Sequence, residues 1–330
     1  AVDMCFENAV FSDPDANPWY AAGECAEFSI PYGPSTVTQN ITIEALQFNM
    51  ASFNVAPDNP AIADIFGDAG VLLMKNDDGD FFAPDFGVDQ IGDVNLSEGY
   101  KIFINGMTDQ SVSVTGPPVD AFQSLLIEAY KLNLLPYLPQ AEMASADAFG
   151  PHNDNILLVA NDSGDFYVPS FGVFSLDMLY PGEAYSIFLS GASDIDFTYP
   201  APGLARVDDD MKEYYRSCVA EHYTPVKTGI PYPVILTGLN GHINLGDEIA
   251  AYANGEVVGA VKVMDLSKPA VITAWEGYHD HTIDLPGFDI GEEIELRVWD
   301  AVQNREVRVE SNLSNNQYGM TPLTSGSITV

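Results

Sequence analysis

The sequence predicts an all-β protein: two tandem small β-rich repeat modules, each with a short helix, followed by an antiparallel β-sandwich. Three observations carry this prediction. One pattern occurs twice without a gap, at residues 71–109 and 156–194. Short strand-like runs separated by turn residues fill the chain after Tyr232. Apolar residues make up 46% of the 330-residue chain, so each part has enough of them to build a core.

The repeat is the most informative feature of the sequence. Both copies contain an apolar run, VLLM or ILLV, followed by the turn Asn-Asp-x-Gly-Asp and a return strand that ends at Pro84 or Pro169. Glycine permits the positive φ at which a hairpin reverses, so each copy should contain a β-hairpin. Each copy closes with an alternating strand, YKIFI or YSIFL.

Each copy also has an opening segment that precedes this hairpin. A strand is expected near residues 46–57 in the first copy and near 130–140 in the second. A short helix should follow the strand. In the first copy, we expect Asp58 to cap this helix and Pro60 to lie in its first turn.

The C-terminal region reads as a series of short strands. The Asn254-Gly255 pair between AAYA and EVVGA predicts a two-residue type I′ turn. The run EIELRVW alternates in polarity, which indicates a strand with one buried face. We therefore expect a β-sandwich over 201–330, after repeats at 43–117 and 118–200 and an extended, disulfide-linked segment at 1–42.

The chain is strongly acidic, with a net charge of −36 because 48 Asp and Glu outnumber 12 Lys and Arg. This balance excludes a typical nucleic-acid binder and a protein that docks on anionic membranes. No apolar run is long enough to span a bilayer, so membrane insertion is not expected. The acidity can serve solubility alone, or it can suit a medium rich in salt or divalent cations.

Three cysteines occur, at Cys5, Cys25 and Cys218. A Cys5–Cys25 disulfide would staple an N-terminal segment that has no evident core, and it would fit an oxidising compartment. In that case Cys218 is unpaired, or it replaces one of the other two in the bridge. Three free, buried thiols are the alternative.

Oxygen-bearing side chains surround the repeated turn. Asn76, Asp78 and Asp80 take alternate positions and Asp85 follows shortly after, which makes the first copy a candidate calcium site. The second copy offers the smaller set Asn161, Asp162 and Asp165. An ordinary hairpin turn, in which Asn, Asp and Gly are favoured by geometry, explains the same residues.

The repeats resemble a module common in large secreted proteins of Bacteroidota, which carries a dG..y.P..g stretch followed by G.GY. The first copy has Gly99 before Tyr100 where the second has Ala184 before Tyr185. The segments GDEIAAYANGEVVGAVKV and GFDIGEEIELRVWD resemble a β-sandwich module of the same type IX-secreted proteins. The resemblance covers about residues 43–330 and implies an extracellular or cell-surface location with the signal peptide already removed. It implies no catalytic residues.

The functional expectation follows from these points. The chain has no GxSxG, HExxH, P-loop or GxGxxG motif, so we expect neither an enzyme nor an organic cofactor. We expect an extracellular structural or adhesive protein that assembles with copies of itself or other surface proteins, as in a filament or surface layer. The alternative is a glycan- or calcium-binding accessory module of a larger secreted enzyme or adhesin.

Both ends of the chain bear on assembly. Residues 34–45 and the final SGSITV are rich in β-forming residues. Each segment either adds to the sheet of a neighbouring subunit or completes a sheet of its own chain.

Overall fold

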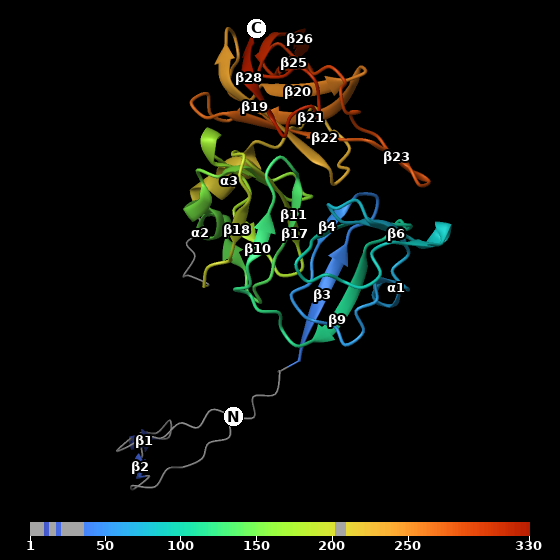
Figure 1. Ribbon diagram of the computed structural model, residues 1–330. Coiled ribbons are helices and arrows are strands. Elements are labelled where there is room, and N and C mark those ends of the chain that lie inside the picture. Colours follow the sequence, from blue (N-terminus) through green and yellow to red (C-terminus); the bar gives the residue numbers. More distant parts are fainter. Residues whose placement is uncertain (1–9, 13–17, 21–35, 202–208) are drawn as a thin grey trace.

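The structure is a computed structural model, and it describes residues 10–12, 18–20, 36–201 and 209–330. Three units lie together in Figure 1: the first repeat in blue and cyan, the second in green, and the C-terminal unit in orange and red above both. Strands dominate and the described helices are short, which confirms the all-β prediction. Near the N-terminus, β1 (Val10–Ser12) pairs with β2 (Pro18–Tyr20). Cys5 and Cys25 lie outside the described residues.

Both repeats fold into a five-stranded antiparallel sheet. The strand order is β4-β8-β5-β6-β7 in the first and β11-β17-β13-β14-β15 in the second. Every strand of one sheet therefore has a counterpart in the other, as the sequence repeat predicts. The first sheet contains β4 (Asn49–Ala51), β5 (Val71–Lys75), β6 (Phe81–Ala83), β7 (Val88–Asp89) and β8 (Tyr100–Ile104). The second contains β11 (Asn133–Pro136), β13 (Ile156–Ala160), β14 (Phe166–Val168), β15 (Val173–Phe174) and β17 (Ala184–Leu189).

A two-stranded ribbon completes each repeat. β3 (Val37–Ile43) pairs with β9 (Gln110–Gly116), and β10 (Leu125–Ile127) pairs with β18 (Ile195–Phe197). Alternate residues of β3 and β9 are buried, so this ribbon covers one edge of the core of the first repeat. The β-forming segment at 34–45 thus pairs within its own chain, and the first repeat reaches back to Val37.

The predicted short helices are present as α1 (Ile62–Ile65) and α2 (Ser145–Phe149). The cap prediction is wrong, because the residue before α1 is Ala61 and makes no side-chain cap bond. Asn59 accepts the Ala61 N–H instead, at 3.3 Å. The remaining short elements are η1 (Pro84–Phe86), η2 (Gly150–His152) and η3 (Pro169–Phe171), with β12 (Met143–Ala144) paired to β16 (Met178–Leu179).

The C-terminal unit begins with α3 (Asp209–Ser217), followed by an eight-stranded sheet of order β26-β25-β20-β21-β22-β19-β28-β27. Its outermost strands, β26 and β27, are consecutive in the chain with only Val309 between them. The predicted sandwich is therefore one sheet that curls until its edges meet. Its strands are β19 (Pro231–Asn240), β20 (Glu248–Ala253), β21 (Glu256–Lys262), β22 (Ala270–Trp275), β25 (Glu295–Asp300), β26 (Arg305–Arg308), β27 (Glu310–Leu313) and β28 (Thr324–Thr329).

Two details of this sheet bear on the sequence predictions. The Asn254-Gly255 turn is confirmed, since both residues have positive φ and join β20 to β21. The last strand, β28, lies between β19 and β27, so both of its edges are occupied within the chain. Its pairing with β19 is parallel, whereas the sequence led us to expect an antiparallel arrangement throughout.

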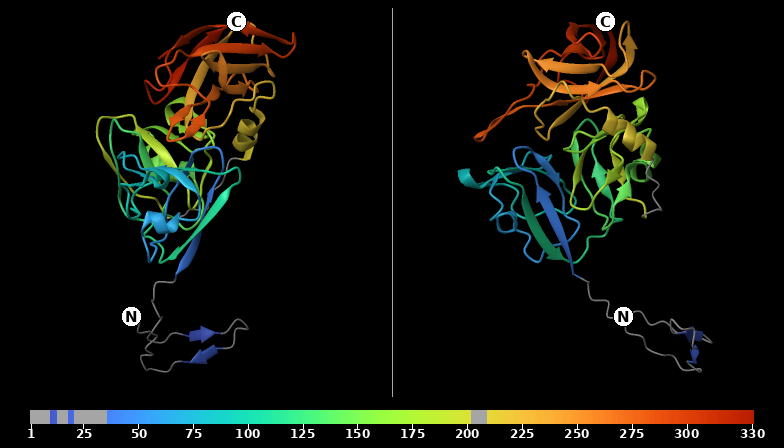
Figure 2. Two further views of the ribbon diagram at one scale, coloured as in Figure 1. Left: turned by 90° about the vertical axis from the view of Figure 1, so that its right-hand side faces the viewer. Right: turned by 180° about the vertical axis from the view of Figure 1, so that it is seen from behind.

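The C-terminal unit covers the second face of each repeat sheet. A hairpin of β23 (Tyr278–Asp280) and β24 (Ile283–Leu285) packs Ile283 and Leu285 against Leu73 and Phe103 of the first repeat. The second repeat packs on the eight-stranded sheet itself. Because both faces of β5 and β13 are buried, these strands read as continuous apolar runs. Figure 2 shows the C-terminal unit above both repeats from two further sides.

Candidate functional site

The candidate calcium ligands of the first copy serve to shape the turn. Asn76 Oδ1 accepts the backbone N–H groups of Asp78, at 3.2 Å, and Asp80, at 2.9 Å. The Asp78 carboxylate lies 2.6 Å from Lys131 Nζ, and Asp80 and Asp85 are exposed. Within the described residues, no three His, Cys, Asp or Glu side chains gather closely enough to hold a metal ion. Calcium binding at this turn stays a prediction.

The second copy shows what the turn does for the fold. Asn161 Oδ1 accepts the Asp165 N–H at 2.8 Å, and Asp162 Oδ2 accepts the N–H of Met50, on the first repeat, at 2.8 Å. In the matching bond from the other side, Asp77 Oδ2 of the first repeat accepts the N–H of Leu134, on the second repeat, at 3.1 Å. The two repeats are therefore joined by reciprocal bonds around an approximate twofold axis.

Gly99 and Ala184 lie face to face on this axis. A Cβ built on Gly99 would be 2.7 Å from the Ala184 Cβ and 2.9 Å from the Leu134 carbonyl oxygen. Equivalent positions meet themselves at a twofold axis, so a side chain fits at only one of the two. This contact explains why the two copies differ here.

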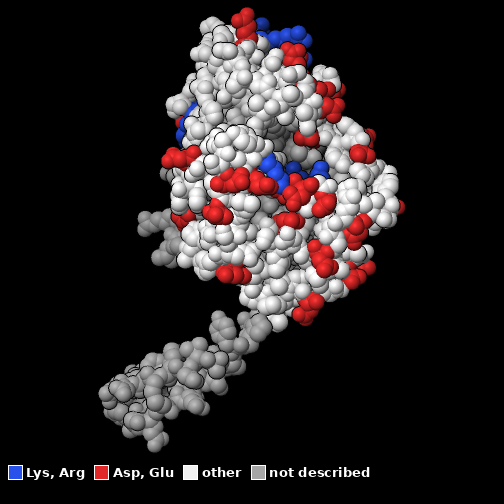
Figure 3. Space-filling model, in the orientation of Figure 1, with Lys and Arg blue, Asp and Glu red and all other residues white. Residues whose placement is uncertain are grey.

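A cavity of about 420 Å³ opens beside the joint between the repeats. We call it the junction pocket, and it is lined by all three units, among them Lys75, Lys101, Ala160, Ser186, Tyr232 and Glu276. Figure 3 shows Asp and Glu spread over the visible face, while Lys or Arg side chains lie in the hollow beneath the C-terminal unit as well as at the top and left edge of the molecule.

The two lysines of the pocket lie opposite each other on neighbouring strands. Lys75 on β5 pairs in register with Lys101 on β8, and both are partly buried. The corresponding residues of the second repeat are Ala160 and Ser186, which also line the pocket. Both cations of the pocket lining therefore come from the first repeat.

These charges lack close partners. Among the described residues, no carboxylate lies within 4.0 Å of Lys75 or Lys101 in an ion pair, although acids greatly outnumber bases. Lys75 Nζ instead lies 5.4 Å from the ring centre of Phe48 and 5.0 Å from that of Tyr278. Opposed like charges destabilise a strand pair.

Burial decides how these groups titrate. It lowers the pKa of Lys101 to about 8; the neighbouring Lys75 acts in the same direction, and Glu276 and Asp162 oppose it. Burial also lowers the pKa of Lys75 and raises that of Glu276. Perturbed groups that share a cavity mark a candidate binding site.

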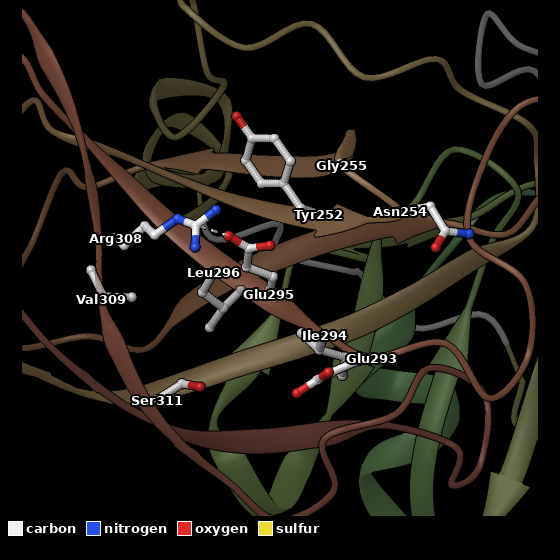
Figure 4. A pocket seen from close by; sticks show the side chains of 10 residues that line it. All are labelled: Tyr252, Asn254, Gly255, Glu293, Ile294, Glu295, Leu296, Arg308, Val309 and Ser311. Atoms are coloured by element: carbon white, nitrogen blue, oxygen red, sulfur yellow. Dashed lines mark ion pairs between the residues drawn. The ribbon is translucent and has the colours of Figure 1, made fainter.

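A second pocket, of about 460 Å³, lies where the curled sheet closes. We call it the seam pocket; Tyr252, Asn254, Glu293, Glu295, Arg308 and Ser311 are among its lining residues (Figure 4). Arg308 Nε already pairs with Glu295 Oε1 at 3.5 Å, and its side chain is 80% exposed. The junction pocket is therefore the better candidate, because its cations are unpaired and partly buried.

Sequence reasoning did not find the junction pocket. Lys75, Lys101 and Glu276 lie far apart in the chain, and only strand register and the packing of the C-terminal unit bring them together.

Comparison with known proteins finds no matching family model, no matching curated protein and no matching solved structure. None of the helices in the described ranges is long and apolar enough to cross a membrane. Cys218 is half-buried and forms no disulfide with any described residue.

Proposed function

We propose that this chain is an extracellular binding module that holds a small organic anion in the junction pocket. The observation that carries the proposal is the opposed pair Lys75 and Lys101, which is partly buried and free of ion pairs among the described residues. An anion between the two ammonium groups would relieve their repulsion and make charge-assisted hydrogen bonds.

The rest of the lining indicates what the anion carries. Leu158, Phe188, Ile230 and Met320 give the pocket apolar walls. Ligand sites of this size are mostly apolar with a few polar groups that fix orientation. The pocket therefore fits a carboxylate attached to an aliphatic or aromatic body.

The wider role is that of a structural or adhesive part of a secreted protein, with copies of itself or other surface proteins as partners. The resemblance to secreted modules and the acidic composition support this role. Glycan binding or calcium binding within a larger secreted protein is the alternative, and the exposed turn residues Asp80 and Asp85 are where calcium would be tested first.

Isothermal titration calorimetry tests the pocket with three probes of equal length: hexanoate, hexanol and hexylamine. We expect saturable binding of hexanoate alone. Lys75→Met and Lys101→Met should each weaken it about 10-fold, since a hydrogen bond to a charged group contributes on the order of 1.5–3 kcal/mol.

Lys212→Met is the matched control, because Lys212 pairs with Asp177 at 3.0 Å and does not line the pocket. It should leave hexanoate binding unchanged. Equal binding of acid and alcohol, or an equal effect of all three lysine variants, contradicts the proposal.

A further inference from the structure

Lys101 has an unusual position for a lysine. It lies on β8 in the wall of the junction pocket, directly opposite Lys75, and its ammonium group makes no hydrogen bond or ion pair with the other described residues. Most other lysines of the described chain form an ion pair with a carboxylate, namely Lys131, Lys212, Lys227 and Lys262.

Charged groups on three elements act on Lys101. Lys75 of β5 disfavours the protonated form of Lys101. Two carboxylates favour the protonated form: Glu276, which follows β22, and Asp162, in the turn after β13. Burial outweighs the two acids, so at mildly alkaline pH a substantial fraction of Lys101 is the free amine. Desolvation and a neighbouring cation are the two known ways to activate a lysine as a nucleophile.

We propose that Lys101 is a reactive amine that forms an imine with the aldehyde or keto group of an organic acid held in the junction pocket. The inference rests on the proposed function, since Lys75 would hold the carboxylate of that acid. The Lys101 nitrogen attacks the carbonyl carbon, a C–N bond forms, and the carbonyl oxygen leaves as water with the two amine hydrogens. No electron is gained or lost.

Reductive trapping tests this step on the full chain. The protein is incubated with glyoxylate and cyanoborohydride at pH 7.5, and peptide mass spectrometry measures the rate of modification at each lysine. We expect Lys101 to react at least 10-fold faster than Lys212 or Lys262. Lys101→Arg should remove the fast site and leave the slow ones unchanged.

Two variants with opposite effects separate the electrostatic cause from mere exposure. Benzaldehyde replaces glyoxylate here, because an uncharged probe does not need the carboxylate partner. Lys75→Met removes the repelling charge and should slow Lys101 several-fold at pH 7.5, whereas Glu276→Gln should accelerate it. Lys75→Arg keeps the charge and should match the unaltered protein.

Modification of Lys101 at the rate of Lys212, or the same direction of change in both variants, overturns the inference. The outcome is distinct from failure of the proposed function. If hexanoate binds but Lys101 is no faster than other lysines with either carbonyl probe, only the imine proposal is lost. If Lys101 reacts fast with benzaldehyde but neither hexanoate nor glyoxylate shows a preference for the pocket, the proposed anion site is contradicted, whereas the reactivity of the Lys101 amine is supported.

Discussion

At the scale of single residues, the two copies of the repeat differ where their symmetry requires it. Asp77 and Asp162 occur in both copies because each accepts a backbone N–H from the other repeat. Lys75 and Lys101 occur in the first copy only, and Ala160 and Ser186 take their places in the second, so the cations of the pocket come from one repeat. For these four positions, the residues shared by both copies lie at the joint, and the residues that differ line the pocket.

Gly99 gives the residue-scale prediction. Gly99→Ala places a Cβ 2.7 Å from that of Ala184, and overpacking of this kind costs about 1–3 kcal/mol in the free energy of unfolding. Urea denaturation measures the loss. The double variant with Ala184→Gly should recover part of it, because the contact with the Leu134 carbonyl oxygen remains.

Gly191→Ala is the control for this prediction. Gly191 is exposed, its φ is not positive, and a Cβ there would meet nothing within 4 Å. The control should unfold at the same urea concentration as the unaltered chain. A Gly99→Ala variant that does the same would show that the two repeats are not held at this distance.

At the scale of elements, the sequence predicted what local pattern determines. The hairpins around the Asn-Asp-x-Gly-Asp turns, both short helices and the Asn254-Gly255 turn follow from nearby residues. The β3–β9 ribbon was missed, because its strands pair Val37 with Gly116 and such distant partners leave no local signal. The candidate site was missed for the same reason: the register of β5 and β8 sets it.

Glu183, in the loop before β17, gives the element-scale prediction. Burial raises its pKa to about 7, and Asp162 and Asp165 add to this effect. The pKa of Glu183 is higher in the folded state than in the unfolded state, so the protonated form of Glu183 favours folding. This contribution to the free energy of unfolding is fully present below about pH 4.5 and is lost as pH rises through 7. The joint between the repeats should therefore be more stable at pH 5 than at pH 8.

Glu183→Gln should flatten this dependence, since glutamine does not titrate. We expect the difference in unfolding free energy between pH 5 and pH 8 to shrink by about 1–2 kcal/mol, a figure reduced for the partial exposure of the side chain. Urea titrations at the two pH values measure it. The exposed Glu142→Gln should keep the original slope, and an equal slope in both variants would place the pH dependence elsewhere.

At the scale of the whole molecule, the three units share their cores. The second face of the first repeat is covered by the β23–β24 hairpin, and that of the second repeat by the eight-stranded sheet. The repeats meet each other through Met50, Leu134 and Ala184. No unit buries all of its apolar surface alone, so we expect the full chain to unfold in one cooperative transition.

Ile283→Ala tests this coupling. Ile283 belongs to the C-terminal unit, but its buried side chain packs on the sheet of the first repeat. Its truncation should reduce the free energy of unfolding by about 2–4 kcal/mol and lower the temperature of the single melting transition of the whole chain in calorimetry. The exposed Leu245→Ala should leave that transition in place. If the units were independent, calorimetry would resolve separate transitions and Ile283→Ala would shift only the transition of the C-terminal unit. The junction pocket would then have no fixed walls, because each unit contributes one of them.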